Sequence, residues 1–184
     1  MSMSRLLVAV LFFSLCAVAH AGEFRLVSPT LAAGGKLPDE QVLNGFGCNG
    51  RNVSPALVWE HLPAGTRSIA LTMYDPDAPT GSGWWHWVVV NLPASTRGLP
   101  AGAGDATAKL LPEGAQQVRT DFGEPGYGGA CPPAGARPHR YIFTAFALKV
   151  EKLDLPQNAT AALAGFMINA NTIGKASLTV RYGR

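Results

Sequence analysis

The stretch that decides the fold runs from residue 75 to residue 91 and reads DPDAPTGSGWWHWVVVN. Its second half is apolar apart from His86 and the closing Asn, and the segment before it, 68–74 (SIALTMY), is also apolar. Two apolar runs of this length, joined by a turn rich in Pro and Gly, predict two neighbouring strands. Loops at the ends of a rigid sheet are where binding and catalytic residues concentrate. The turn therefore predicts a site as well, because it carries the carboxylates Asp75 and Asp77.

Other apolar runs extend this prediction to the rest of the chain. The run 140–148 is apolar on both faces, which is typical of a central strand buried on each side. In a regular strand, Trp85 and Trp87 share one face, and Trp84 and His86 share the other. Several strands with long loops predict a mainly β fold, a β-sandwich with a few peripheral helices. The predicted strands are 24–27, 56–59, 68–74, 84–91, 116–121, 140–148 and 175–182.

One helix is predicted over residues 159–170, with Asn158 as its N-cap. Helical spacing brings four apolar residues onto one face, which we expect to pack against the sheet. These residues are Ala162, Leu163, Phe166 and Met167.

The first 21 residues are typical of a secretory signal peptide. Arg5 is followed by the apolar run 6–18, and Ala19-His20-Ala21 fits the small-residue cleavage rule. The run is short for a span of the bilayer, and the alternative is a retained anchor. We therefore expect residues 22–184 to form a single domain that is periplasmic or secreted.

Two cysteines, Cys48 and Cys131, remain after this cleavage. An even count in an exported protein favours a disulfide, with two buried free thiols or a metal or redox pair as alternatives. The formal net charge of the whole sequence is only +3, which is too small to argue for a nucleic-acid partner.

Two histidines stand where a binding site needs them. His86 and His139 each open a strongly apolar run beside a proline-rich turn, and Asp75 and Asp77 precede His86. Either histidine alone is also consistent with a hydrogen-bonded core residue. Together, two imidazoles and two carboxylates at strand ends predict one shared pocket. His61, in contrast, precedes a turn and is expected to be exposed.

Such a pocket has three chemical uses. Oriented imidazoles, with the backbone N–H groups of 128–130, can bind an anion such as phosphate or carboxylate. The same groups can act as general acid and base. A metal is disfavoured because no tight ligand spacing such as H-x-x-x-H is present. A nucleophile motif is also missing, and Cys131 is a candidate only outside a disulfide. We therefore assign no catalytic residue, metal or cofactor, and favour binding over enzymatic activity.

Four segments together resemble the phosphatidylethanolamine-binding protein family, in particular its bacterial branch of Raf-kinase-inhibitor-like proteins. They are DPDAP (75–79), WWHWVVVN (84–91), GGACPP (128–133) and HRY (139–141). The resemblance covers nearly all of the chain after residue 24. It implies a β-sandwich with a small ligand pocket and a few helices.

The resemblance also implies what the pocket holds. The expected ligand is a small anion, namely phosphate, a carboxylate or a phospholipid head group, and a bridge between Cys48 and Cys131 would tie the loop 44–50 to the pocket rim. The expected function is an exported binding protein that modulates a protein or head-group partner. A hydrolase using the His and Asp residues, or a protein-interaction or enzyme-inhibitor module, are the alternatives. Whether the protein forms a homodimer is left undecided by the sequence, and no transmembrane anchor is expected. The implied ligand-binding residues are Asp75, Asp77, Ala78, Pro79, Trp84, His86, Gly129, Cys131, Pro132, His139 and Tyr141.

Overall fold

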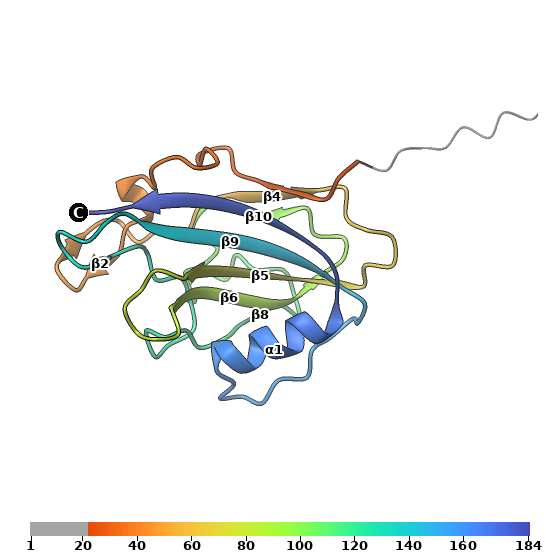
Figure 1. Ribbon diagram of the computed structural model, residues 1–184. Helices are drawn as coiled ribbons and strands as arrows, with labels where there is room; N and C mark the ends of the chain where they lie inside the picture. Colours follow the sequence, from red (N-terminus) through yellow and green to blue (C-terminus); the bar gives the residue numbers. More distant parts are fainter. Residues whose placement is uncertain (1–21) are drawn as a thin grey trace, which may run out of the picture.

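Five antiparallel strands form the main sheet in a computed structural model, which describes residues 22–184 (Figure 1). The predicted signal peptide, residues 1–21, lies outside the described residues. Within the described part of the chain, no helix is long and apolar enough to cross a membrane. In spatial order, the strands are β10 (Thr172–Tyr182), β9 (His139–Leu148), β5 (Ser68–Asp75), β6 (Trp84–Pro93) and β8 (Gln116–Gln117).

A smaller sheet packs on one face of the main sheet. Between the two sheets lies a core in which Trp59 of the small sheet and Trp87, Tyr141 and Phe143 of the main sheet are almost completely buried. This arrangement confirms the predicted mainly β sandwich. The small sheet has the order β1 (Arg25–Val27), β4 (Leu57–Glu60) and β7 (Gly98–Leu99). The remaining elements are the hairpin β2 (Asn44–Gly45) and β3 (Cys48–Asn49), the 3-10 helix Asp39–Gln41 and the helix α1 (Ala161–Asn171).

Helix α1 covers the opposite face of the main sheet, where it contacts β6 and β9 (Figure 1). The predicted buried face is wrong: Leu163 and Phe166 are 39% and 69% exposed. Apolar residues surround this helix, so their spacing does not select one face. The small residues face the sheet because the bulky Trp85 ring occupies the space there, 3.4 Å from where a side chain at Gly165 would begin. The buried helix residues are Ala161, Ala164, Gly165 and Ile168.

The start of the helix also differs from the prediction. The N-cap is Thr160, whose hydroxyl accepts a hydrogen bond from the Leu163 N–H at 3.2 Å, and Asn158 lies two residues upstream. Ser and Thr cap helices by the same chemistry as Asn, so a sequence that contains both near one helix start does not fix the boundary.

A β-bulge in β6 changes which side chains share a face. Met73 pairs with Trp87 and Tyr74 with Trp85, so His86 is the extra residue without a partner of its own. Trp87 enters the core between the sheets, whereas Trp85 packs with the core under α1. The predicted common face of these two tryptophans is therefore wrong, because a bulge shifts the alternation of a strand by one residue.

Strands β8 and β9 correct two further expectations. The predicted edge strand 116–121 is a regular strand only at Gln116–Gln117, although the Val118 N–H still donates to the Val88 carbonyl. Residues 120–124 then turn, with the Thr120 N–H bonded to the Glu124 carbonyl. Strand β9 is central, but it is fully buried on one face only; the face that includes Ile142 and Thr144 is half-buried. The alternation of 175–182 is confirmed, with Ala176, Leu178 and Val180 buried.

Candidate functional site

A cavity of about 230 Å³ opens at one end of the main sheet. Strand β5 ends there, and its antiparallel neighbours β6 and β9 begin there, so the topology brings Asp75, Trp84 and His139 together. The loop 76–83 and the segment 131–133 close two further sides. Of the residues implied by the resemblance, the cavity lining contains Asp75, Ala78, Pro79, Trp84, His86, Cys131, Pro132 and His139.

His86 lies at the bulge of β6 and is 4% exposed. Its Nδ1 atom is 2.7 Å from the carbonyl oxygen of Gly128, so Nδ1 carries the proton and donates it. Burial in a poorly solvated site disfavours the charged ring and lowers the pKa of His86 to about 4, although the carbonyl and Asp75 act in the opposite direction. The imidazole is therefore neutral at neutral pH.

His139 is held by a carboxylate in place of a carbonyl. Its Nδ1 lies 2.7 Å from Oδ2 of Asp75, and both side chains are almost fully buried. The other oxygen of Asp75 accepts a hydrogen bond from the backbone N–H of Asp77 at 2.8 Å. Asp75 is thus fixed by the turn that follows β5 and in turn orients the ring of His139.

In both histidines, Nδ1 is therefore hydrogen-bonded to the protein, and Nε2 is the nitrogen left for a ligand. In the described chain, neither Nε2 has a protein hydrogen-bond partner, and neither is among the fully buried atoms left without one. Each Nε2 must therefore reach the solvent of the cavity that His86 and His139 line. Two fixed imidazole edges in a small cavity can bind one polar group between them.

Asp77 does not line the cavity. Its carboxylate binds the guanidinium of Arg140 through two bonds of 2.9 and 2.8 Å and also accepts the backbone N–H of Arg140 at 2.9 Å. These hydrogen bonds hold the pKa of Asp77 far below its usual range. In this structure Asp77 fixes the turn against the start of β9, and it reaches the cavity only through its backbone contact with Asp75.

Gly129 and Tyr141 also lie behind the lining. The Gly129 N–H donates to Oδ1 of Asn52 at 2.7 Å, and a Cβ at Gly129 would stand 2.3 Å from the Gln41 carbonyl oxygen. Tyr141 is fully buried, with its ring edge-to-face against His86 at 5.2 Å. Burial, and then the charge of Asp75, raise the pKa of the Tyr141 phenol.

Four lining residues were not predicted from the sequence: Phe46, Thr80, Phe122 and Pro133. Phe46 and Phe122 come from loops whose sequence gives no periodicity. The signal for Phe46 was indirect, because a bridge from Cys48 to Cys131 brings its loop to the pocket rim.

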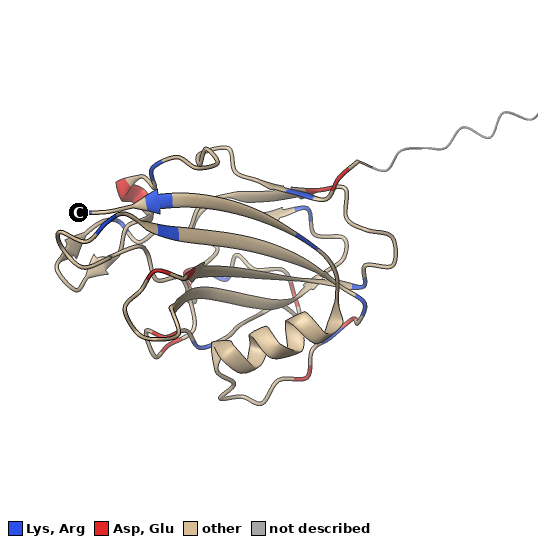
Figure 2. Ribbon diagram, viewed as in Figure 1, with Lys and Arg blue, Asp and Glu red and all other residues tan. Residues whose placement is uncertain are grey.

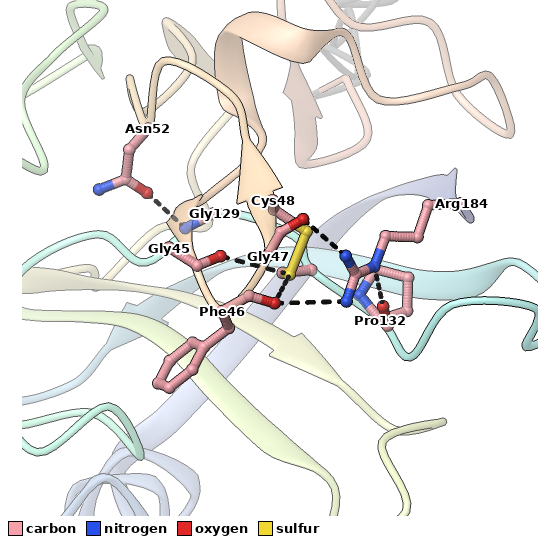
Figure 3. The surroundings of a disulfide bond; sticks show 9 residues. Gly45, Phe46, Gly47, Cys48, Asn52, Gly129, Pro132 and Arg184 are labelled. Carbon is pink, nitrogen blue, oxygen red and sulfur yellow. Dashed lines mark hydrogen bonds between the residues drawn. A yellow bond between two sulfur atoms is a disulfide. The ribbon is translucent and has the colours of Figure 1, made fainter.

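The expected disulfide between Cys48 and Cys131 is present (Figure 3). Cys131 is a lining residue, so the bond fastens the β2–β3 hairpin to the mouth of the cavity. The Arg184 guanidinium holds the same hairpin, donating to the carbonyls of Gly47 at 2.8 Å and Phe46 at 3.3 Å, while its Nε donates to Pro132 at 2.8 Å. In Figure 3 the ring of Phe46 points away from both tethers.

Positive charge gathers near this end of the main sheet. Arg140 and Arg181 are direct partners across β9 and β10 (Figure 2), and Arg137 lies 3.4 Å from the carboxylate of Asp77. The carboxylate of Asp77 thus stands beside the guanidinium groups of Arg137 and Arg140, and Arg181 is the strand partner of Arg140. Among the described residues, no group of three or more His, Cys, Asp or Glu side chains is placed to hold a metal ion.

Comparison with known proteins agrees with this architecture. Residues 27–183 match the family model described as phosphatidylethanolamine-binding protein. The chain is 48% identical to YbcL of Escherichia coli over 180 residues, covering 98% of each chain. It is 52% identical to YbhB of the same organism over 158 residues, covering 86% of this chain and 99% of YbhB. LppC of Mycobacterium tuberculosis, named as a candidate lipoprotein, is 37% identical over 86% of this chain and 71% of its own length.

Solved structures show the same relationship. The crystal structure of Escherichia coli YbcL, described as a new member of the mammalian family, matches with a TM-score of 0.86 and 51% identity, covering 89% of this chain and 99% of that one. A homologue from Chlamydia trachomatis matches with a TM-score of 0.73 and 29% identity, over 88% and 98% of the two chains. The sandwich, the motif order and these matches agree, and the chain belongs to the phosphatidylethanolamine-binding protein family.

Proposed function

We propose that this protein is an exported binding protein whose cavity holds a small anionic group between His86 and His139. The observation that carries this proposal is the shared use of Nδ1, which leaves both Nε2 atoms for a ligand. A phosphate, a carboxylate or a phospholipid head group offers the oxygens that such a pair can bind.

The neutral state of His86 determines how the anion binds. Its Nε2 carries a lone pair and cannot donate to a fully ionised oxygen. Either the ligand brings a proton, as a monohydrogen phosphate does, or His86 takes up a proton when the ligand binds. The second route couples binding to proton uptake by His86, so along it affinity rises as the pH falls toward the pKa of about 4. Along the first route, affinity follows the fraction of the ligand that already carries a proton.

Binding is favoured over hydrolysis by the side chains of the lining. The only hydroxyl among the described lining side chains belongs to Thr80, and it donates a hydrogen bond to the carbonyl of Gly83. The sulfur of Cys131 is part of the disulfide. A hydrolase in this pocket would have to activate a water molecule with the same two histidines.

Export is supported by three independent observations. The sequence begins with a predicted signal peptide, the described chain contains a disulfide, and the relative LppC is named as a candidate lipoprotein. Disulfides persist mainly in oxidising compartments such as the periplasm.

The test is calorimetric titration with phosphate and phosphoethanolamine at pH 5.5 and 7.5. His86→Asn and His139→Asn should each weaken binding about tenfold or more, corresponding to the loss of one hydrogen bond to a charged group. His61→Asn is the matched control, because His61 is exposed and has positive φ, which Asn tolerates. Equal binding by the wild type and His86→Asn would contradict the proposal.

A panel of ester and phosphoester substrates tests the hydrolase alternative. Turnover by the wild type that disappears in His139→Asn and persists in His61→Asn would replace binding by catalysis as the function.

A further inference from the structure

An aromatic side chain at the mouth of the cavity is exposed to solvent. Phe46 is 76% exposed, the largest value among the exposed large apolar residues of the described chain. Its backbone has φ of 50°, a left-handed conformation that bulky residues rarely adopt. The two-residue turn between β2 and β3 requires positive φ at both Phe46 and Gly47, and Asn or Asp would meet this requirement with less strain than Phe. A large exposed ring at such a position, at the mouth of a cavity, therefore points to a role in binding.

Two tethers keep Phe46 in this position. The disulfide fixes Cys48 two residues away, and Arg184 binds the Phe46 carbonyl itself (Figure 3). A side chain whose backbone is already held in place loses less conformational freedom when a ligand packs against it. The hairpin therefore acts as a preorganised lip of the cavity.

A continuous series of rings leads from this lip to the floor. Phe46 stacks on Phe122 with centroids 6.1 Å apart and planes inclined by 23°. Phe122 makes edge-to-face contacts at 5.4 Å with both Trp84 and His86. The same lining contains prolines 79, 132 and 133, whose rings are rigid and apolar. Asp75, His86 and His139 are thus the charged or titratable part of the cavity, and aromatic and proline rings make up most of the rest.

We propose that the ligand is an anion attached to an aromatic ring, and that Phe46 and Phe122 bind this ring. The inference rests on the proposed anion site and adds the part of the ligand that leaves it. Rings prefer stacked or edge-to-face partners at the distances already present here, whereas a flexible chain would lose conformational freedom between rigid walls. The chemical class is therefore a small aryl phosphate or aryl carboxylate.

The experiment compares four probes by calorimetry: inorganic phosphate, phosphoethanolamine, hexyl phosphate and phenyl phosphate. The wild type should bind phenyl phosphate about 3- to 10-fold more tightly than phosphoethanolamine, which is the usual contribution of aromatic pairs. Phe46→Ala should abolish most of this ratio. Phe166→Ala is the matched control, because Phe166 is equally an exposed Phe but lies on α1, and it should leave the ratio unchanged.

Each outcome separates the two proposals. If phosphoethanolamine binds but phenyl phosphate has no advantage, or if hexyl phosphate binds as tightly as phenyl phosphate, the aromatic subsite is refuted and the anion site stands. If no probe binds, the anion site itself is refuted. The double variant Cys48→Ala, Cys131→Ala provides a second check on the hairpin, since it keeps both phenylalanines but removes the disulfide tether. It should lower the phenyl phosphate ratio; an unchanged ratio would overturn the role of preorganisation.

Discussion

His86 and His139 use the same ring nitrogen for different neighbours. Nδ1 of His86 faces a neutral carbonyl, whereas Nδ1 of His139 faces the carboxylate of Asp75. His86 therefore has no carboxylate at hydrogen-bond distance, and burial lowers the pKa of its ring.

The buried neutral His86 should make folding stability depend on pH. Its pKa is about 4 in the folded protein and 6.5 in the unfolded chain, so between these values only the unfolded state binds the proton. The free energy of unfolding should thus fall as the pH drops from 6.5 to 4, by about 3 kcal/mol at about 1.4 kcal/mol per pKa unit.

Denaturant titrations of the wild type and His86→Asn across this pH range measure the effect. Asn keeps a side-chain N–H for the Gly128 carbonyl but does not titrate, so its stability curve should be flatter in this window. Parallel curves for the two proteins would contradict the depressed pKa of His86.

The titratable groups of the site could be predicted from the sequence, but their hydrogen-bond partners could not. Asp75 and Asp77 look equivalent in the sequence, yet Asp75 is the last residue of β5 and reaches His139, while Asp77 lies in the turn and binds Arg140. The difference depends on which residue is the last of the strand, and a pattern of residue types does not fix that boundary. The carbonyl that holds His86 comes from Gly128, 42 residues away, and no local signal identifies it.

Among the elements, α1 was the hardest to orient from sequence. Its existence could be predicted, but a helix with apolar residues all round has no unique buried side. The buried face of strand β10 could be predicted, because its apolar residues alternate with polar ones and therefore define a single face. Strand β6 lay between these cases. Its position in the sequence was predicted, but the bulge at His86 depends on pairing with β5 and places Trp85 and Trp87 on opposite faces, where the sequence had predicted one common face.

Two glycines give a matched test of these element contacts. Gly165 lies in the interior of α1, and a Cβ there would touch the Trp85 ring at 3.4 Å, an ordinary contact. Gly165→Ala should therefore raise the free energy of unfolding by about 0.5–1 kcal/mol, because Ala restricts the unfolded chain and favours helix. Thermal and denaturant unfolding measure this.

Gly129→Ala is the same chemical change with the opposite expected sign. A Cβ at Gly129 would lie 2.3 Å from the backbone oxygen of Gln41, and the backbone must shift to accept it. We expect a loss of about 1–3 kcal/mol, typical of overpacking. Stabilisation by Gly129→Ala would contradict the close approach to Gln41, and destabilisation by Gly165→Ala would contradict the ordinary contact with Trp85.

For the whole molecule, the disulfide is the longest covalent constraint. Cys48 and Cys131 are separated by 83 positions in the sequence, so closing this loop reduces the entropy of the unfolded chain by an amount equivalent to about 4–5 kcal/mol on the loop-entropy model. The double variant Cys48→Ala, Cys131→Ala should lose stability of up to this size in denaturant titrations. Wild type treated with a dithiol reductant should show the same loss, and the variant should not respond to the reductant. Equal stability of oxidised and reduced wild type would contradict the expected constraint.

The same bond divides the chain into a closed ring and two tails. Strands β4 to β8 lie inside the ring, while β1, β9, α1 and β10 lie outside it. If the oxidised protein is pulled apart from Gly22 and Arg184, the force passes through the disulfide and cannot straighten the ring. The 83-position span, about 280 Å of extended chain, stays hidden until the bond is reduced. The two oxidation states therefore differ in contour length, and in an oxidising compartment the segment that carries Asp75 and His86 is mechanically protected.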